Sequence, residues 1–165
     1  MRDKNIIWLY LFLIATIVDL SFLTEQNESM RVYSKPVILL GLILYFYFIS
    51  KPIASTLLAK TILAALLFSW LGDILLLWSD LFIFGLGAFL MAHVCYIFGF
   101  RLAQQPEGRL DSWHTIRSFL YNLPVYFLAG LVFYFIYPNL GGLKIPVIAY
   151  ILVIVGMVTT ARARF

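Results

Sequence analysis

Charged side chains are scarce in this 165-residue chain. Asp, Glu, Lys and Arg together make up 12% of the residues, about half the share that is usual in soluble domains. Apolar residues make up 63%. A small domain leaves a large part of its surface exposed, and with this composition that surface would be largely apolar. A soluble globular fold is therefore excluded, and lipid is the solvent that suits the chain.

Residues for redox, metal and nucleotide chemistry are also few. The single cysteine, Cys95, excludes an intramolecular disulfide. The two histidines, His93 and His114, stand far apart and without clustered carboxylates. The sequence has no Walker A motif and no nucleophile elbow. Its net charge of +4 is spread over basic residues that stand singly beside apolar runs, so no nucleic-acid-binding stripe forms. We therefore expect no metal, no cofactor and no nucleic-acid partner.

The sequence does contain six apolar runs, each about as long as a helix needs to cross the hydrocarbon core, roughly 20 residues. None of them alternates with the period of two that is typical of strands. The pattern predicts an all-α fold, a polytopic transmembrane helical bundle that forms one integral membrane domain over residues 1–165. The predicted spans are 6–23, 32–50, 53–78, 81–100, 118–137 and 143–161, with the start of the third uncertain and as late as Ser55.

The distribution of Lys and Arg between the connections predicts the orientation, because cytoplasmic loops carry an excess of both. With the N-terminus inside, the inner set is Arg2, Lys4, Lys51, Lys60, Arg101, Arg109, Arg117, Arg162 and Arg164, and the outer set is Arg31, Lys35 and Lys144. We therefore expect both termini in the cytoplasm, and a bacterial cytoplasmic (inner) membrane as the location.

Ionisable side chains within the spans need a reason, since each costs about 2.5–3.5 kcal/mol at a helix centre on insertion scales. Asp73 lies near the outer end of the third span, beside Gly72, which permits close approach of a neighbour. Asp19 and Lys35 lie at a similar depth in the first two spans, and Pro36 after Lys35 suits the first turn of a helix. The three charges could form one charge-compensated site. Alternatively, Asp73 bonds a neighbouring helix and Lys35 extends to the interface.

Two polar residues of the fourth span lie deeper than Asp73, by one to two helical turns. His93 and Tyr96 are three residues apart and therefore share one helix face. They either extend the candidate site or make a hydrogen bond between helices. Lys60 is expected to extend to the cytoplasmic interface.

These motifs resemble those of the YhhN family of lysoplasmalogenase-like integral membrane proteins. The resemblance covers essentially the whole chain, and its most specific part is the block from Ser69 to Tyr96. It rests on Lys35-Pro36, Ser69-Trp70-Leu71-Gly72-Asp73, Gly87-Ala88-Phe89-Leu90 followed by His93 and Tyr96, and Pro146-Val147-Ile148-Ala149-Tyr150.

The resemblance implies hydrolysis of the vinyl ether bond of a lysoplasmalogen, a membrane lysophospholipid, to a fatty aldehyde and a glycerophospho-base. It nominates Asp73 as the principal catalytic carboxyl and His93, Lys35 and Tyr96 as further site residues. We expect catalytic roles for Asp73 and His93, and substrate binding by Lys35, Tyr96 and Asp19. The reaction needs a general acid and a base or positioned water, and an apolar helix favours the neutral form of a carboxyl.

The family typically has eight spans, and a later span carries a second carboxyl. This chain ends at Phe165 after six predicted spans. We therefore expect it to lack the last two spans, and to be inactive unless His93 or Asp19 replaces the second carboxyl. The alternative is a non-catalytic multi-pass membrane protein, such as a small transporter or an assembly subunit, in which Asp73 relays a substrate or pairs helices. The oligomeric state is not predicted.

Overall fold

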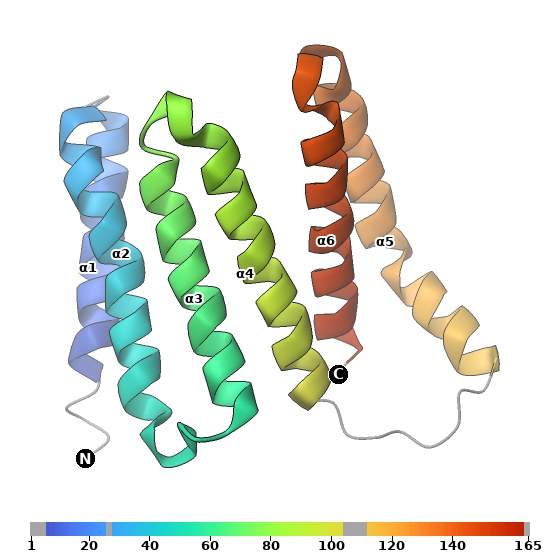
Figure 1. The fold of residues 1–165 in the computed structure, drawn as a ribbon, viewed down its shortest axis with the longest axis horizontal. Helices are drawn as coiled ribbons and strands as arrows, with labels where there is room; N and C mark the ends of the chain where they lie inside the picture. The colour runs from blue at the N-terminus through green and yellow to red at the C-terminus, as the bar shows by residue number, and fades with distance from the viewer. Residues whose placement is uncertain (1–5, 26–27, 104–111, 164–165) are drawn as a thin grey trace. The chain divides into compact units, whose positions relative to one another are not determined.

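The computed structural model describes residues 6–25, 28–103 and 112–163, and these form helices joined by short connections (Figure 1). The predicted all-α fold is confirmed, because the described residues include no strand. The helices are α1 (Ile6–Thr24), α2 (Glu28–Ile49), α3 (Leu57–Leu75), α4 (Phe82–Ala103), α5 (Ser112–Ile136) and α6 (Lys144–Arg162), with 3₁₀ turns η2 (Lys51–Ile53), η3 (Ser79–Leu81), η4 (Tyr137–Asn139) and η5 (Gly141–Leu143).

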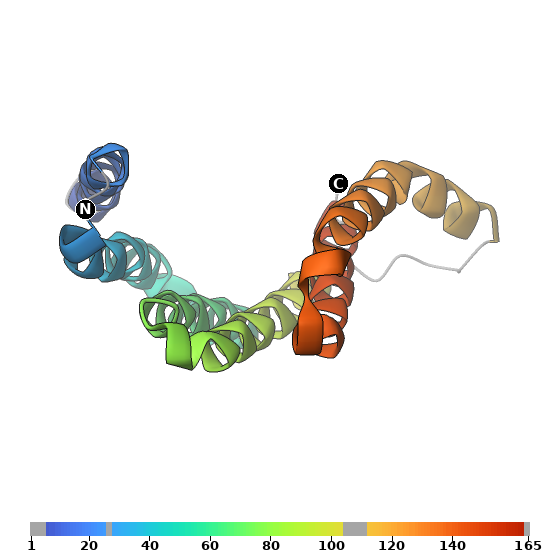
Figure 2. The same cartoon turned by 90° about the horizontal axis from the view of Figure 1, so that it is seen from above.

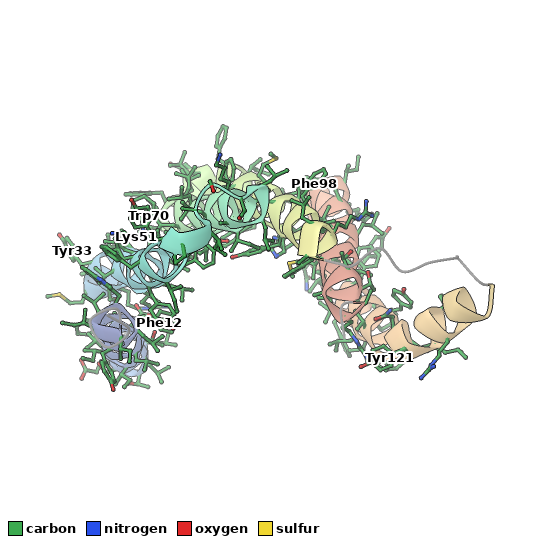
Figure 3. The ribbon with its side chains drawn as sticks, turned by 90° about the horizontal axis from the view of Figure 1, so that it is seen from below. Phe12, Tyr33, Lys51, Trp70, Phe98 and Tyr121 are labelled. Atoms are coloured by element: carbon green, nitrogen blue, oxygen red, sulfur yellow. The ribbon has the colours of Figure 1, made fainter. Side chains whose placement is uncertain are left out.

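Six helices among the described residues are long and apolar enough to cross a membrane, which confirms the predicted number of spans. Their surfaces are apolar as well: among the described residues no large side chain is fully buried, and Tyr33 is 74% exposed. Side chains project from the helices along their length (Figure 3). Such a surface suits lipid or further protein. The orientation stays a prediction, and Arg2, Lys4, Arg109 and Arg164, which it uses, lie outside the described residues.

The start of α2 differs from the prediction in a way that matters for the site. The helix begins at Glu28, and Pro36 lies inside it, about two turns from its start. The prediction that Pro36 opens this helix was therefore wrong. A proline inside a helix removes one backbone hydrogen bond. This early part of α2 also contacts α1 through the hydrogen bond from Ser34 to Asp19.

Other helix ends also differ from the predicted ends of the spans. Some apolar residues lie in turns outside a helix, and some polar residues lie within one. Leu57 begins α3 after Thr56, whose hydroxyl accepts a hydrogen bond from the Ala59 amide at 3.2 Å. The predicted span 53–78 was therefore too long at both ends. In contrast, α5 begins at Ser112, six residues before the predicted start. Hydropathy marks where a helix meets lipid, whereas backbone hydrogen bonds decide where the helix begins.

The chain divides into two compact units, Met1–Cys95 and Tyr96–Phe165. In the first unit, α1 packs against α2 and α2 against α3, and these helices follow one another side by side in chain order (Figure 2). The ring of Trp8 stacks on that of Phe48 with centroids 5.7 Å apart, which joins the start of α1 to the end of α2. In the second unit, α5 and α6 pack as a hairpin.

Glycines allow close approach of helices within the first unit. A Cβ atom added at Gly41 of α2 would lie 3.1 Å from the backbone nitrogen of Phe12 in α1. One added at Gly72 of α3 would lie 2.7 Å from ring carbons of Phe89 in α4. These two contacts bring α1 against α2 and α3 against α4, as small residues do at helix interfaces in membranes.

Candidate functional site

Asp19 joins α1 to α2 through polar contacts. Its Oδ1 accepts a hydrogen bond from Ser34 Oγ at 2.5 Å, and Arg31 Nε lies 3.9 Å from the same oxygen. The side chains of Asp19 and Arg31 are each only 15% exposed, and Ser34 is 9% exposed. A hydroxyl donor and a guanidinium are the partners expected of an ionised carboxylate.

Arg31, Ser34 and Lys35 lie on one face of α2, because positions three and four apart are neighbours on a helix. The sequence prediction counted Arg31 as an outer loop residue and did not consider Ser34. Their spacing was visible in the sequence, but the predicted helix start at residue 32 left Arg31 outside the helix. The actual start at Glu28 places all three residues on the same helical surface.

A hydrogen bond between α2 and α3 lies beside Lys35. The indole nitrogen of Trp70 donates to the carbonyl oxygen of Pro36 at 2.8 Å. Trp70 and Asp73 are three residues apart, so both lie on the face of α3 that meets α2. This hydrogen bond therefore fixes the register of α3 against α2 close to the carboxyl of Asp73.

The structure brings three of the predicted site residues together. The half-buried carboxyl of Asp73 interacts electrostatically with Lys35, which attracts it, and with Asp19, which repels it. Asp73 lies only two residues before the end of α3, about 3 Å of helical rise. That Asp19, Lys35 and Asp73 form one functional site stays a prediction.

We refer to Asp19, Arg31, Lys35 and Asp73 as the charged cluster. Two acidic and two basic side chains give the cluster a formal charge of zero when all four are ionised. Compensation of this kind lowers the cost of placing charges among apolar helices, because unpaired buried charges are strongly destabilising. The cluster lies at the end of α1, near the beginning of α2 and at the end of α3.

His93 lies deeper along α4, as the sequence predicts. Contacts between α3 and α4 pair Gly72 with Phe89, and Leu76 with Gly85. By this register His93 is level with residue 68, about 7 Å along the helix axis from Asp73. Its Nδ1 lies 2.5 Å from the carbonyl oxygen of Phe89. Because a carbonyl only accepts, Nδ1 carries the proton, and in the neutral ring Nε2 has the lone pair.

The remaining predicted residues lie elsewhere. Tyr96 is the first residue of the second unit, where its ring stacks on Phe100 with centroids 6.1 Å apart. Its role in substrate binding stays a prediction. Lys60 is exposed, as a side chain that extends to the interface would be. Within the described parts of the chain, no three His, Cys, Asp or Glu side chains gather into a metal-binding group.

Comparisons with known proteins identify relatives of this chain. Two proteins named lysoplasmalogenase, from Mycobacterium bovis and Mycobacterium tuberculosis, are each 38% identical to it over 111 residues. The aligned part covers 62% of this chain and 39% of each relative, so the chain spans about two fifths of the length of these relatives. No solved structure matches the chain. The model of the YhhN family matches residues 30–165, which include Arg31, Lys35, Asp73, His93 and Tyr96. The chain therefore belongs to the YhhN family.

Proposed function

We propose that this multi-pass membrane protein is a lysoplasmalogenase, which hydrolyses the vinyl ether bond of lysoplasmalogens. The relatives that share 38% of aligned residues carry that name, and the membrane setting suits a lipid substrate. One structural observation carries the proposal: the Asp73 carboxyl lies among apolar helices within electrostatic range of both Lys35 and Asp19. This arrangement supplies an acid, a second carboxyl and a cation in one place.

The proposed reaction adds one water molecule across an enol ether. A proton moves to the β-carbon of the vinyl group, and the α-carbon becomes an oxocarbenium ion. Water attacks that carbon and loses a proton, giving a hemiacetal. The carbon–oxygen bond to glycerol then breaks, and the products are a fatty aldehyde and a glycerophospho-base. The steps need a general acid at the β-carbon and a group that accepts a proton from water.

We assign the role of general acid to Asp73, which is half-buried and lies at the end of its helix. Asp19 is the nearest candidate for the second carboxyl. Its contacts with Ser34 and Arg31 suit an anion that stabilises the oxocarbenium ion or orients the water. Two carboxyls in different surroundings are the usual basis of a division between acid and base roles.

Cations of the charged cluster are proposed to bind the phosphate of the substrate. Lys35 offers a compact charge, and Arg31 offers a planar guanidinium that binds phosphate with two hydrogen bonds. Both lie on the same face of α2 as Ser34. His93, deeper on α4, is proposed as an additional proton acceptor through Nε2.

A non-catalytic role is the second candidate, and the contacts of Asp19 favour it. The Ser34–Asp19 hydrogen bond and the nearby Arg31 would also serve to pair helices in a subunit of an assembly. A non-catalytic protein would release no fatty aldehyde, whether or not Asp73 is replaced. Measuring fatty aldehyde release by the wild type and by Asp73→Asn therefore separates the two candidates.

The location of the active site follows from the proposed orientation. We propose a bacterial cytoplasmic membrane with both termini in the cytoplasm, on the basis of the Lys and Arg count. The charged cluster then lies on the outer side, at the depth of lipid headgroups. A lysophospholipid of the outer leaflet would reach it without crossing the membrane.

The test measures fatty aldehyde release from lysoplasmenylethanolamine by the purified protein in detergent. We expect release by the wild type and a loss of about 10²–10⁴-fold in Asp73→Asn, the range typical for removal of a general acid or base. Asp80→Asn is the matched control, because Asp80 is an exposed carboxyl in η3. No release by the wild type contradicts the enzyme, and equal release by wild type and Asp73→Asn contradicts the role of Asp73.

A further inference from the structure

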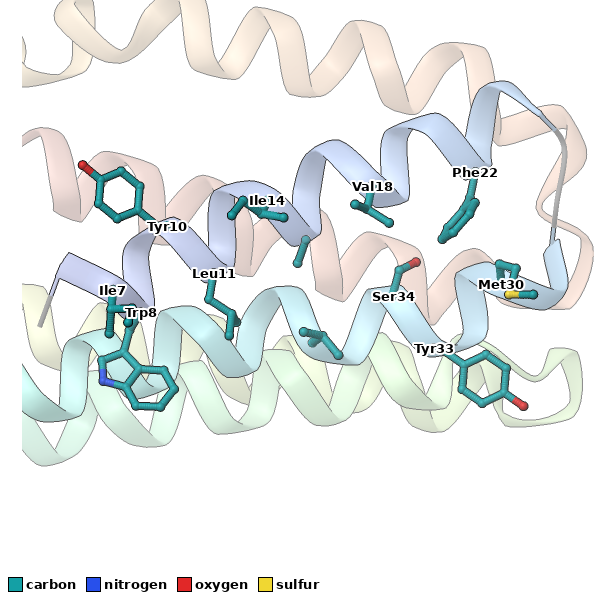
Figure 4. Close-up of a pocket in the computed structure, with 12 residues that line it drawn as sticks. Ile7, Trp8, Tyr10, Leu11, Ile14, Val18, Phe22, Met30, Tyr33 and Ser34 are labelled. Atoms are coloured by element: carbon teal, nitrogen blue, oxygen red, sulfur yellow. The ribbon is translucent and has the colours of Figure 1, made fainter.

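An open groove of about 710 Å³ runs along the seam between α1 and α2 (Figure 4). Its lining is largely apolar, and three of its residues carry a hydroxyl group, Tyr10, Tyr33 and Ser34. The lining residues from α1 are Ile7, Trp8, Tyr10, Leu11, Ile14, Ala15, Val18 and Phe22, and those from α2 are Met30, Tyr33, Ser34 and Val37. Its volume lies in the range of binding sites for small ligands, about 300–1,000 Å³.

One residue of the groove, Ser34, contacts the charged cluster. Ser34 lines the groove and donates its hydroxyl hydrogen to Asp19. Ala15 and Phe22, which also line it, lie one turn before and one turn after Asp19 on the same face of α1. Ser34 therefore links the lining of the groove to the carboxylate that Arg31 approaches.

The length of the groove suits one hydrocarbon chain. Ile7 and Phe22, near its two ends on α1, are separated by roughly 22 Å at the α-helical rise. Half of the hydrocarbon core of a bilayer is about 15 Å thick. An extended lipid chain of one leaflet therefore fits within the groove along the helices.

We propose that this groove binds the hydrocarbon chain of a single-chain lysophospholipid whose phosphate lies at Arg31 and Lys35. The inference rests on the proposed function, from which it takes the ligand, and adds where the chain of that ligand lies. From the cluster the chain runs along α1 past Ile14 toward Ile7, and its first carbons pass Ser34 beside Asp19.

A second copy of the protein is the competing occupant, since an apolar helix would also cover the lining. The anionic phosphate of the lipid favours it as the occupant, because two cations of α2 lie near the groove. A lysophospholipid brings an apolar chain for the groove and an anionic phosphate for the two cations of α2, in the order in which the protein presents them. An apolar helix from a second copy would match only the lining, whereas the phosphate of a lysophospholipid would in addition have Arg31 and Lys35 as cationic partners.

The test uses a photoreactive probe that the proposed enzyme does not hydrolyse. The probe is a lysophosphatidylethanolamine with a saturated alkyl ether chain and a diazirine at the chain end, and peptide mass spectrometry locates the label. We expect the label near Ile7 and Leu11, with competition by the unlabelled lipid. Ile14→Trp should reduce labelling at least fivefold, because the indole fills the middle of the groove.

Ile17→Trp is the matched control. Ile14 and Ile17 are both isoleucines of α1 with similar exposure, 61% and 67%, but only Ile14 lines the groove. Labelling should be unchanged in Ile17→Trp. Equal labelling in both variants, or label scattered over other helices in the wild type, would overturn the inference. The inference would also be overturned if the groove stayed unlabelled and chemical cross-linking joined α1 of one copy to α1 of another. Should Ile14→Trp fail to fold, the position of the wild-type label decides.

The two proposals fail in different ways. Label in the groove that depends on Ile14, without aldehyde release by the wild type, removes the proposed enzyme and leaves the lipid-binding groove. Aldehyde release that depends on Asp73, with label outside the groove, removes the groove as the chain site and leaves the enzyme.

Discussion

Gly72 is the position at which the structure makes its sharpest prediction about packing. A Cβ atom there would lie 2.7 Å from two ring carbons of Phe89, whereas carbon atoms in ordinary contact are about 3.5–4.0 Å apart. In Gly72→Ala, the Phe89 ring or the α4 backbone must therefore move by about 1 Å. Gly87 of α4 offers a matched comparison, because a Cβ atom there meets nothing within 4 Å.

The expected magnitude follows from two opposing terms. Overpacking at a close contact costs about 1–3 kcal/mol, and replacing a helical glycine with alanine contributes about 0.5–1 kcal/mol of stability. Gly72→Ala should therefore be destabilised by up to about 2.5 kcal/mol. Gly87→Ala gains only the stabilisation from replacing a helical glycine with alanine, and it should be slightly more stable than the wild type. The difference between the two variants isolates the packing cost.

The assay is unfolding of each variant by sodium dodecyl sulfate in mixed micelles, followed by circular dichroism. Because Asp73 follows Gly72 directly, Gly72→Ala should also lower aldehyde release, since a misplacement of about 1 Å is able to cost 10²-fold in rate. Equal stability of Gly72→Ala and Gly87→Ala would refute the close contact of α3 with Phe89.

Two further changes probe the contacts of α2. Trp70→Phe removes the hydrogen bond to the Pro36 carbonyl and should cost about 0.6 kcal/mol and no more than about 1.7 kcal/mol in the same assay, the average and the maximum measured for hydrogen bonds between membrane helices; the exposed Trp78→Phe should cost less. Ser34→Ala removes a donor to Asp19 and should cost about 1–3 kcal/mol, because a buried carboxylate loses a partner; an unchanged midpoint would contradict that contact.

Much of the site could be predicted from the depth of its residues. Asp19, Lys35 and Asp73 each lie near the same end of consecutive antiparallel helices, and short connections bring such ends together. Arg31 and Ser34 could not be assigned in this way. They belong to a part of α2 that precedes its apolar run, and their contacts with Asp19 depend on the packing of α1 against α2.

The groove along α1 and α2 shows what sequence patterns leave open. In a soluble helix, an apolar stripe marks the buried face. The helices here are apolar on all sides because lipid takes the place of water, so the pattern does not show which face meets a neighbour. The close approach at Gly41 and the hollow beside Ser34 and Ala15 exist only once two helices have packed.

The sequence by itself determined the membrane class, the helical fold and the six spans, and it singled out Asp73 as a candidate, because apolar length and the rarity of charge are local properties. The tertiary structure alone decided that Arg31 and Ser34 contact Asp19 and that an apolar groove lined by Ser34 runs between α1 and α2. Those features depend on distances between helices. Such distances follow from side-chain packing between segments that are far apart in sequence.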